Sequence, residues 1–180
     1  LCVNQPIIFK DTSTIDFGEI TKIEWYYDDA TPTIVERDNN PNLRSAAAKN
    51  YPHTYPIFYT PAQRSVNVKM VAYSGNSATC ISSITKTIIL KAAPIANFSI
   101  PDGCLTNGDA QFTDASTFLR SNTGLTYLWD FGDASSGSSN TSNLRNPIHH
   151  FQSAQDYTIN LTITAPNGCS AIISKVFKVR

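Results

Sequence analysis

Two groups of aspartates are the side chains of this 180-residue sequence that first suggest chemistry. Asp28 and Asp29 are adjacent, and Asp130 and Asp133 stand on either side of a Phe-Gly pair. A hydrolase needs two carboxylates that face each other across a cleft, one of them with a raised pKa. Aspartates beside a turn glycine instead accept backbone N–H bonds. Carboxylates and loop carbonyls also bind calcium, although the sequence lacks the spacing of an EF-hand. We therefore expect a structural turn without a cofactor, with a calcium site as the alternative, and no catalytic residues.

The histidines and serines offer no better basis for catalysis or metal binding. His149 and His150 are neighbours, so on a strand their rings face opposite ways and cannot easily bind one ion together. The serine-rich stretch at residues 135–142 has no Gly-x-Ser-x-Gly motif and is typical of a loop between strands. The sequence therefore predicts that the chain is not an enzyme.

The composition is that of a folded protein with no net charge. Hydrophobic residues make up 41% of the chain and charged residues 16%, and 14 basic residues balance 14 acidic ones. A nucleic-acid-binding protein needs a basic surface, so nucleic acid is not an expected partner. No apolar run is long enough for a membrane-spanning helix, so membrane insertion is not expected either. The first residue is Leu1 rather than Met, from which we expect a segment of a longer chain.

The chain contains an internal repeat, in which the same short motifs occur twice in the same order. The first copy contains Trp25 and His53, and the second contains Trp129 and His149 in the same order. The copies differ in the lengths of the segments between motifs, as expected for loops. The matched segments are Phe9–Ser13 with Phe112–Ser116, Ile23–Asp29 with Tyr127–Asp133, Pro52–Tyr55 with Ile148–Phe151, Val66–Met70 with Ile159–Ile163, and Ile84–Leu90 with Ile173–Val179. The sequence therefore predicts two similar domains.

Both copies are predicted to be all-β. Apolar and β-branched residues alternate with polar residues over Ser65–Tyr73 and Tyr157–Thr164, as in half-buried strands. Short strands separated by Pro, Gly, Asn and Ser are typical of a β-sandwich.

The boundary between the copies is predicted at Ala92-Ala93-Pro94. Pro94 fixes its own φ and biases the residue before it toward an extended conformation, so the connection is short and stiff. The predicted domains are residues 1–93 and 94–180. Ile95–Ile100 is predicted to be the first strand of the second domain, and the first domain is expected to lack its counterpart.

The motif Trp-Asp-Phe-Gly-Asp at Trp129–Asp133 resembles the hallmark of the PKD (polycystic kidney disease) domain, an immunoglobulin-like β-sandwich. The later family pattern is similar to Asn146–Phe151 followed by Tyr157–Leu161, with Ala134 and Asp156 standing where glycine is usual. The resemblance implies two immunoglobulin-like β-sandwiches in tandem, the first of them divergent. The residues to which it gives structural roles are Trp25, Asp29, His53, Trp129, Asp130, Phe131, Gly132, Asp133, His149 and Tyr157.

The four cysteines stand at matching places of the two copies. Disulfides Cys2–Cys80 and Cys104–Cys169, one within each copy, fit this repeat, and four buried free thiols are the alternative. Disulfides indicate a location outside the cytoplasm. The tandem form with cysteines is also similar to repeats in large surface proteins of gliding and polysaccharide-degrading bacteria of the Bacteroidetes group. We therefore expect a secreted or cell-surface bacterial protein.

Aromatic residues near the extra segment of the first copy form a candidate ligand platform. Tyr51, Tyr55, Phe58 and Tyr59 have side chains of the kind that stack on sugar rings or enter a protein partner. The sequence favours the other interpretation, in which these residues cover the edge of an enlarged sandwich.

The sequence favours a non-catalytic module that acts as a structural spacer or as an adhesion and protein-interaction segment of a large protein. The alternative is an accessory carbohydrate- or substrate-binding module of a secreted polysaccharide hydrolase or protease. The expected partners are other domains of the same long chain, with a protein or a polysaccharide as a candidate ligand. The chain itself is expected to be a monomer.

Overall fold

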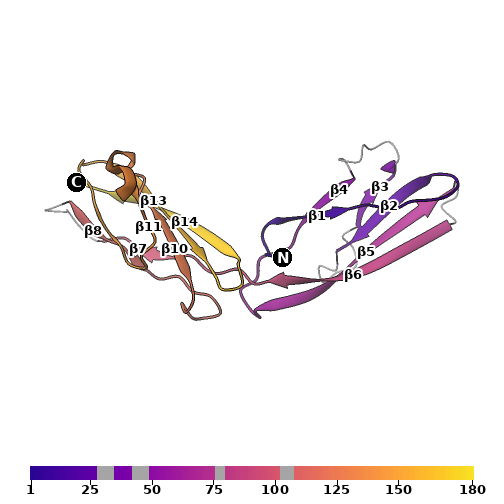
Figure 1. The fold of residues 1–180 in the computed structure, drawn as a ribbon, viewed down its shortest axis with the longest axis horizontal. Coiled ribbons are helices and arrows are strands. Elements are labelled where there is room, and N and C mark those ends of the chain that lie inside the picture. The colour runs from indigo at the N-terminus through magenta and orange to yellow at the C-terminus, as the bar shows by residue number, and fades with distance from the viewer. Residues whose placement is uncertain (28–34, 42–48, 76–79, 102–107) are drawn as a thin grey trace. The chain divides into compact units, whose positions relative to one another are not determined.

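The protein is described by a computed structural model that covers residues 1–27, 35–41, 49–75, 80–101 and 108–180 (Figure 1). Asp28, Asp29 and Cys104 therefore lie outside the described residues. Almost all regular structure in the described chain is β-strand, which confirms the all-β prediction. The chain divides into two compact units, unit 1 at residues 1–57 and 63–91 and unit 2 at residues 58–62 and 92–180. That each unit is a separate immunoglobulin-like domain stays a prediction.

The strands of unit 1 are β1 (Pro6–Lys10), β2 (Ile20–Tyr26), β3 (Val35–Asp38), β4 (Asn50–Thr54), β5 (Gln63–Ser74) and β6 (Cys80–Lys91). A four-stranded antiparallel sheet has the order β3-β2-β5-β6, and β1 pairs with β4. The 12-residue strands β5 and β6 pair along their whole length, from Gln63 opposite Lys91 to Ser74 opposite Cys80.

The strands of unit 2 are β7 (Phe98–Ser99), β8 (Asp109–Gln111), β9 (Thr113–Asp114), β10 (Thr126–Asp130), β11 (Thr141–Ser142), β12 (Ile148–His150), β13 (Asp156–Thr164) and β14 (Ser170–Lys178). A four-stranded antiparallel sheet has the order β11-β10-β13-β14, while β12 pairs with β8 and β7 with β9. A short 3-10 helix, η2 (Ala134–Asn140), connects β10 to β11.

Alternate residues of β13 form the centre of the core of unit 2. Tyr157, Ile159, Leu161 and Ile163 are buried, and the residues between them are more exposed. Successive side chains of a pleated strand point to opposite faces, so this alternation places every second residue in the core. The two strands predicted from alternation lie within β5 and β13, and both predictions are confirmed.

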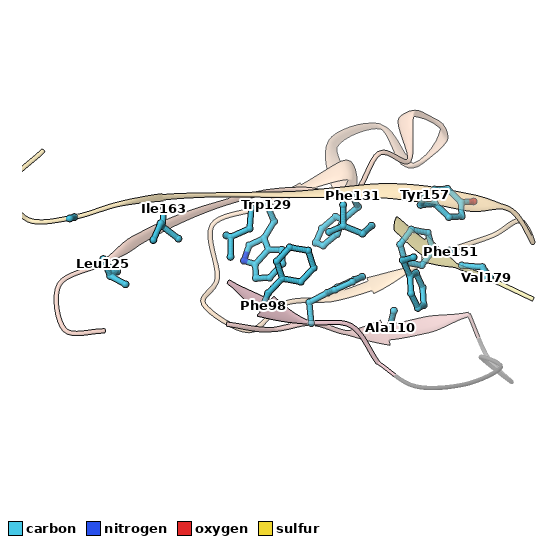
Figure 2. Close-up of a cluster of buried hydrophobic side chains, with 14 residues drawn as sticks. Phe98, Ala110, Leu125, Trp129, Phe131, Phe151, Tyr157, Ile163 and Val179 are labelled. Atoms are coloured by element: carbon cyan, nitrogen blue, oxygen red, sulfur yellow. The ribbon is translucent and has the colours of Figure 1, made fainter. Parts of the chain in front are cut away.

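Trp129 is the largest side chain in the core of unit 2. Figure 2 shows its indole pointing from β10 toward Phe98 of β7, with Phe131 on the same side of the sheet. The ring centroids of Trp129 and Phe98 are 5.1 Å apart, and the planes are nearly perpendicular at 71°. The indole Nε1 donates a hydrogen bond to the Leu144 carbonyl at 2.9 Å. This bond satisfies the one polar atom that the buried tryptophan carries.

Trp25 occupies the corresponding place in unit 1, on β2. Its ring contacts Phe9 of β1 and Tyr51 of β4, with centroids 5.7 Å and 5.4 Å away. Trp25 is buried, as the repeat predicts, but among the described residues its Nε1 has no hydrogen-bond partner. Both cores therefore contain a buried tryptophan, but the indole Nε1 is hydrogen-bonded only in unit 2 among the described residues.

Candidate functional site

The Trp-Asp-Phe-Gly-Asp motif ends β10 in a turn that its own first aspartate closes. Asp130 Oδ1 accepts the backbone N–H of Gly132 at 2.9 Å and the side-chain amide of Asn140 at 3.0 Å. Gly132 has a φ of +64°, and a Cβ added to it would lie 2.5 Å from the Thr158 carbonyl oxygen. Only glycine fits this backbone without a clash, so Asp130 and Gly132 have the structural roles that the sequence predicts.

The second aspartate of the motif is buried against a histidine. His149 Nε2 lies 3.1 Å from Asp133 Oδ2, and both side chains are almost completely inaccessible. The hydroxyl of Ser135 donates to Asp133 Oδ1. This Ser135 bond, together with the charge and hydrogen bond of His149, lowers the pKa of Asp133 against the opposing effect of burial. Both carboxylate oxygens are therefore committed to neighbouring side chains.

The Ser135, Asp133 and His149 side chains do not have the order of a catalytic triad. A nucleophilic serine must hydrogen-bond to the imidazole, which takes its proton, while the carboxylate holds the other side of the ring. Here the hydroxyl bonds to the carboxylate, and the imidazole lies between the rings of Phe131, at 4.3 Å, and Phe151, at 4.5 Å. This arrangement fixes the turn against the core and gives no route for acyl transfer.

Unit 1 has a histidine in a matching aromatic setting. His53 stacks on Tyr27 at 3.9 Å and meets the edge of Tyr55 at 4.6 Å. The Tyr27 hydroxyl donates to Glu36 Oε2 at 2.9 Å, and burial together with this bond raises the pKa of Tyr27. Asp29, the predicted counterpart of Asp133, lies outside the described residues, so its role stays a prediction.

The predicted Cys2–Cys80 disulfide is wrong, and the predicted Cys104–Cys169 disulfide involves a residue, Cys104, that lies outside the described residues. Cys2 and Cys169 are each disulfide-bonded, whereas Cys80 is a free, exposed thiol. Cys2 lies beside Lys91 at one end of β6, and Cys80 begins the other end. A 12-residue strand is about 35 Å long, whereas bonded cysteines need Cα atoms within about 7 Å. The repeated positions of the cysteines in the sequence thus do not bring Cys2 and Cys80 together.

The predicted aromatic platform is largely part of the protein interior. Tyr51, Tyr55 and Phe58 are 0%, 2% and 7% exposed, and Tyr59 alone of the four is accessible, at 42%. The Tyr51 hydroxyl donates to Asp38 Oδ2 at 2.8 Å, and that of Tyr55 donates to the Tyr27 carbonyl at 3.0 Å. Three of the four rings therefore fill cores and do not face a ligand, in keeping with the structural interpretation that the sequence favours for this segment.

Sequence reasoning missed a charged and aromatic cluster around Glu24. Glu24 Oε2 accepts the hydroxyls of Tyr73 at 2.6 Å and Tyr26 at 3.0 Å. Its Oε1 accepts Lys22 Nζ at 3.2 Å and Arg37 Nε at 3.1 Å. These groups come from β2, β3 and β5, on the sheet face opposite to Trp25.

The cluster stabilises the ionised carboxylate. The hydrogen bond from Tyr73, followed by those of Tyr26 and Lys22, outweighs burial and lowers the pKa of Glu24 to about 2. The same bond raises the pKa of Tyr73 to about 12. A carboxylate with so low a pKa is a poor general acid or base at neutral pH. Lys22 Nζ also lies 3.7 Å from the Tyr73 ring centroid, so that ring face is covered.

The signal for this cluster was present in part of the sequence. Lys22, Glu24 and Tyr26 occupy every second position of one strand and therefore share a face. Tyr73 and Arg37 come from other strands, and their approach depends on the sheet register. Within the described residues, no group of three His, Cys, Asp or Glu side chains is placed to hold a metal ion. No described helix is long and apolar enough to cross a membrane.

The motif geometry agrees with a comparison against known families. The family model for the PKD domain matches residues 91–180, half of the chain. The chain belongs to the PKD domain family. The match includes the whole Trp129–Asp133 motif and His149, so the buried Asp–His pair is a feature of the PKD part of the chain.

Two solved PKD domains from Vibrio resemble the chain over one domain length. The PKD1 domain of Vibrio anguillarum Epp has 26% identity and a TM-score of 0.40, covering 49% of this chain and 94% of that chain. The PKD1 domain from the Vibrio cholerae metalloprotease PrtV has 27% identity and a TM-score of 0.39, covering 48% of this chain and 96% of that chain. The fibronectin(III)-like modules of Clostridium thermocellum CbhA have 13% identity and a TM-score of 0.37, covering 99% and 87%. No curated protein matches the chain.

Proposed function

We propose that the chain is a non-catalytic, extracellular tandem PKD module that serves as a spacer or adhesion segment of a larger secreted or cell-surface protein. The observation that carries this proposal is the commitment of the motif's polar groups to the fold. Asp130 holds a turn, and both oxygens of Asp133 bond to Ser135 and His149 inside the structure. Side chains used in this way stabilise a rigid body and leave no nucleophile beside a base.

The tandem character is supported by equivalent geometry within each unit. The four-stranded sheets have matching orders, β3-β2-β5-β6 and β11-β10-β13-β14. His53 stacks on Tyr27 at an interplanar angle of 9°, and His149 stacks on Phe131 at 15°. Apart from Lys91, unit 1 lies outside the residues that the PKD family model matches, so its assignment as a divergent PKD domain rests on this geometry and on the repeated sequence order.

The proposed location and partners follow from chemistry and composition. A disulfide favours an oxidising compartment, and the balance of 14 basic and 14 acidic residues gives no basis for binding nucleic acid. We propose a monomer whose partners are other domains of the same long chain, in a surface protein of the Bacteroidetes type. Calcium is disfavoured at the motif, because the oxygens that it would need already accept hydrogen bonds.

A hydrolysis and binding screen tests this function. Purified protein should not cleave glycans or peptides and should not be retained on insoluble polysaccharides. Asp133→Asn, with Asp130→Asn as the matched control, separates chemistry from folding. Hydrolysis that Asp133→Asn abolishes in a protein that still melts cooperatively would overturn the non-catalytic assignment. Retention on a polysaccharide that Tyr59→Ala abolishes would instead favour an accessory substrate-binding module.

A further inference from the structure

The outer face of the four-stranded sheet of unit 1 carries a cationic and aromatic surface around Glu24. Residues that stand opposite each other on antiparallel strands point to the same side of a sheet, so the strand register decides which side chains share this face. The neighbours of Glu24 on it, from β2, β3, β5 and β6, are Lys22, Tyr26, Arg37, Lys69, Tyr73 and Ile81. These six residues together with Glu24 are called the outer patch below.

The charge of the outer patch is positive. Lys22, Arg37 and Lys69 supply three cations against the single carboxylate of Glu24. The other two acidic residues of these four strands pair with core residues of β2 and therefore lie on the opposite face. A chain without net charge thus has a local excess of positive charge on one face of one sheet.

The hydrogen-bonding capacity that remains in the outer patch belongs to cationic donors. Glu24 already accepts four hydrogen bonds, and its side chain is only 6% exposed. Arg37 gives its Nε to this carboxylate, and within the described residues its two Nη groups have no hydrogen bond although the side chain is 65% exposed. The exposed Lys69 has no hydrogen-bonded partner there either. Donors of this kind bind anions, above all carboxylates.

The sandwich does not require these charges, because unit 2 forms the corresponding sheet without them. When the sheets are aligned through their tryptophans and the strand partners of the tryptophans, Leu128 and Asn160 stand at the places of Glu24 and Lys69. A buried ionic network is also weak evidence for stability, since the cost of removing ions from water offsets their attraction. The charges of unit 1 therefore indicate a role outside the fold itself.

The composition of the outer patch fits a polypeptide better than a sugar. Sugars stack on open aromatic faces, but Lys22 Nζ lies 3.7 Å from the ring centroid of Tyr73, and Lys69 Nζ lies over the ring of Tyr26. Ile81 stands directly opposite Tyr73 and is 61% exposed. A polypeptide can bury this isoleucine while its carboxylates pair with the cations, whereas an anionic polysaccharide has no aliphatic side chain to offer.

We propose that the outer patch is a docking surface for an acidic, extended segment of a partner protein. Two strand spacings and an offset of two residues separate the backbone of Arg37 from that of Lys69 by about 12 Å, which acidic residues four apart in an extended segment can span. A second copy of the chain does not fit, because two patches of the same sign repel each other. The proposal names a partner class for the adhesion role and rests on that part of the proposed function.

A labelled peptide of alternating glutamate and valine, added to the full chain, tests the proposal. The same peptide with glutamine at every glutamate is the control ligand, and fluorescence anisotropy measures the affinity. We expect only the glutamate peptide to bind, and the double substitution Arg37→Gln, Lys69→Gln to weaken its affinity by at least about tenfold. The matched control Lys10→Gln, Lys178→Gln removes two exposed charges elsewhere and should change the affinity by less than about twofold.

Two single variants keep the test valid if the double variant unfolds. Lys69→Gln and Ile81→Ser leave every hydrogen bond of Glu24 in place. Each should weaken binding of the glutamate peptide by about threefold without changing the melting temperature.

The remaining outcomes would overturn the docking surface. Equal affinities for the glutamate and glutamine peptides would refute it, as would an equal loss of affinity in the matched control. Tighter binding of polygalacturonate that Lys69→Gln weakens and Ile81→Ser does not would show that the ligand is an anionic polysaccharide. A chain that binds no peptide and hydrolyses nothing would lose this site and keep the spacer role, whereas hydrolysis would contradict the proposed function alone.

Discussion

The aromatic clusters of the two units have nearly the same ring geometry. In unit 1, Trp25 and Tyr27 lie 6.3 Å apart at an interplanar angle of 3°, and in unit 2, Trp129 and Phe131 lie 6.4 Å apart at 13°. Corresponding rings therefore sit in corresponding places although one pair carries a hydroxyl and the other does not. The shape and direction of the rings are what this sheet arrangement requires.

The polar atoms of the two clusters differ in their hydrogen bonding. In unit 1 the hydroxyls of Tyr27 and Tyr55 need acceptors, which Glu36 and the Tyr27 carbonyl provide. Trp25 Nε1 has none within the described chain, whereas Trp129 Nε1 bonds to a carbonyl. Unit 1 thus combines the same ring arrangement with more polar groups, and we expect its core to contribute less stability per residue than the core of unit 2.

The largest test of this comparison replaces each tryptophan in turn. Trp129→Ala should lower the free energy of unfolding by roughly 3–5 kcal/mol, as for other large truncations in close-packed cores. Trp25→Ala should cost less, because its indole has no hydrogen bond to lose and lines an open hollow of about 250 Å³. Calorimetry of the full chain measures both, with Leu128→Ala as the exposed control. An equal loss of unfolding free energy for the two substitutions would contradict the expectation that the core of unit 1 is the less stable one.

A smaller effect separates the two aspartates of the motif. Asp133→Ala should lower stability by about 3 kcal/mol, because it leaves His149 and Ser135 without their buried acceptor. Asp130→Ala should cost only about 1 kcal/mol, the value of the turn hydrogen bonds that it loses. Urea unfolding measures both variants. A larger loss for Asp130 would mean that the turn, rather than the buried pair, holds this end of unit 2.

The smallest effect concerns pH and the Glu24 cluster, which unit 2 lacks because Leu128 stands at that place. The pKa of Glu24 falls from 4.5 to about 2 on folding. A lowered folded-state pKa gives stability that is fully present above the unfolded pKa and is lost as the pH falls through the folded one. The chain should therefore lose more stability between about pH 5 and about pH 2 than its Glu24→Gln variant does. Glu19→Gln, at an exposed position, is the control and should keep the full pH dependence.

The sequence predicted most of what depends on local pattern. Alternation placed β5 and β13, and the Trp-Asp-Phe-Gly-Asp motif placed the turn, because both signals lie within single segments. The match between the two long strands was less accurate. Val68, rather than Val66, corresponds to Ile159 when the strands are aligned through their tryptophan partners. A shift of two residues keeps the same side chains facing inward, so alternation alone cannot detect it.

Sequence analysis missed the contacts between residues that are far apart along the chain. Glu24 and Tyr73 come from different strands, and no local signal announces that their side chains meet. The cysteines illustrate the same limit, since matching positions in sequence place Cys2 and Cys80 at opposite ends of β6. Tyr51 and Tyr55 were candidates for a surface platform because they follow the extra segment of the first copy, although Tyr55 ends the matched segment Pro52–Tyr55. Their burial follows from the pairing of β4 with β1, which only the fold determines.

The position of β6 at the end of its sheet has a consequence for solubility. A long outer strand rich in isoleucine offers its free backbone groups to any other strand, which is the usual start of intermolecular β-aggregation. Leu1 covers one end of the outer edge of β6, because the Lys91 N–H donates a hydrogen bond to the Leu1 carbonyl at 2.7 Å. Lys86 interrupts the remainder with a charge that would be costly to bury between two joined sheets. Leu1 and Lys86 are thus the two features of this strand that disfavour its pairing with a strand of another molecule.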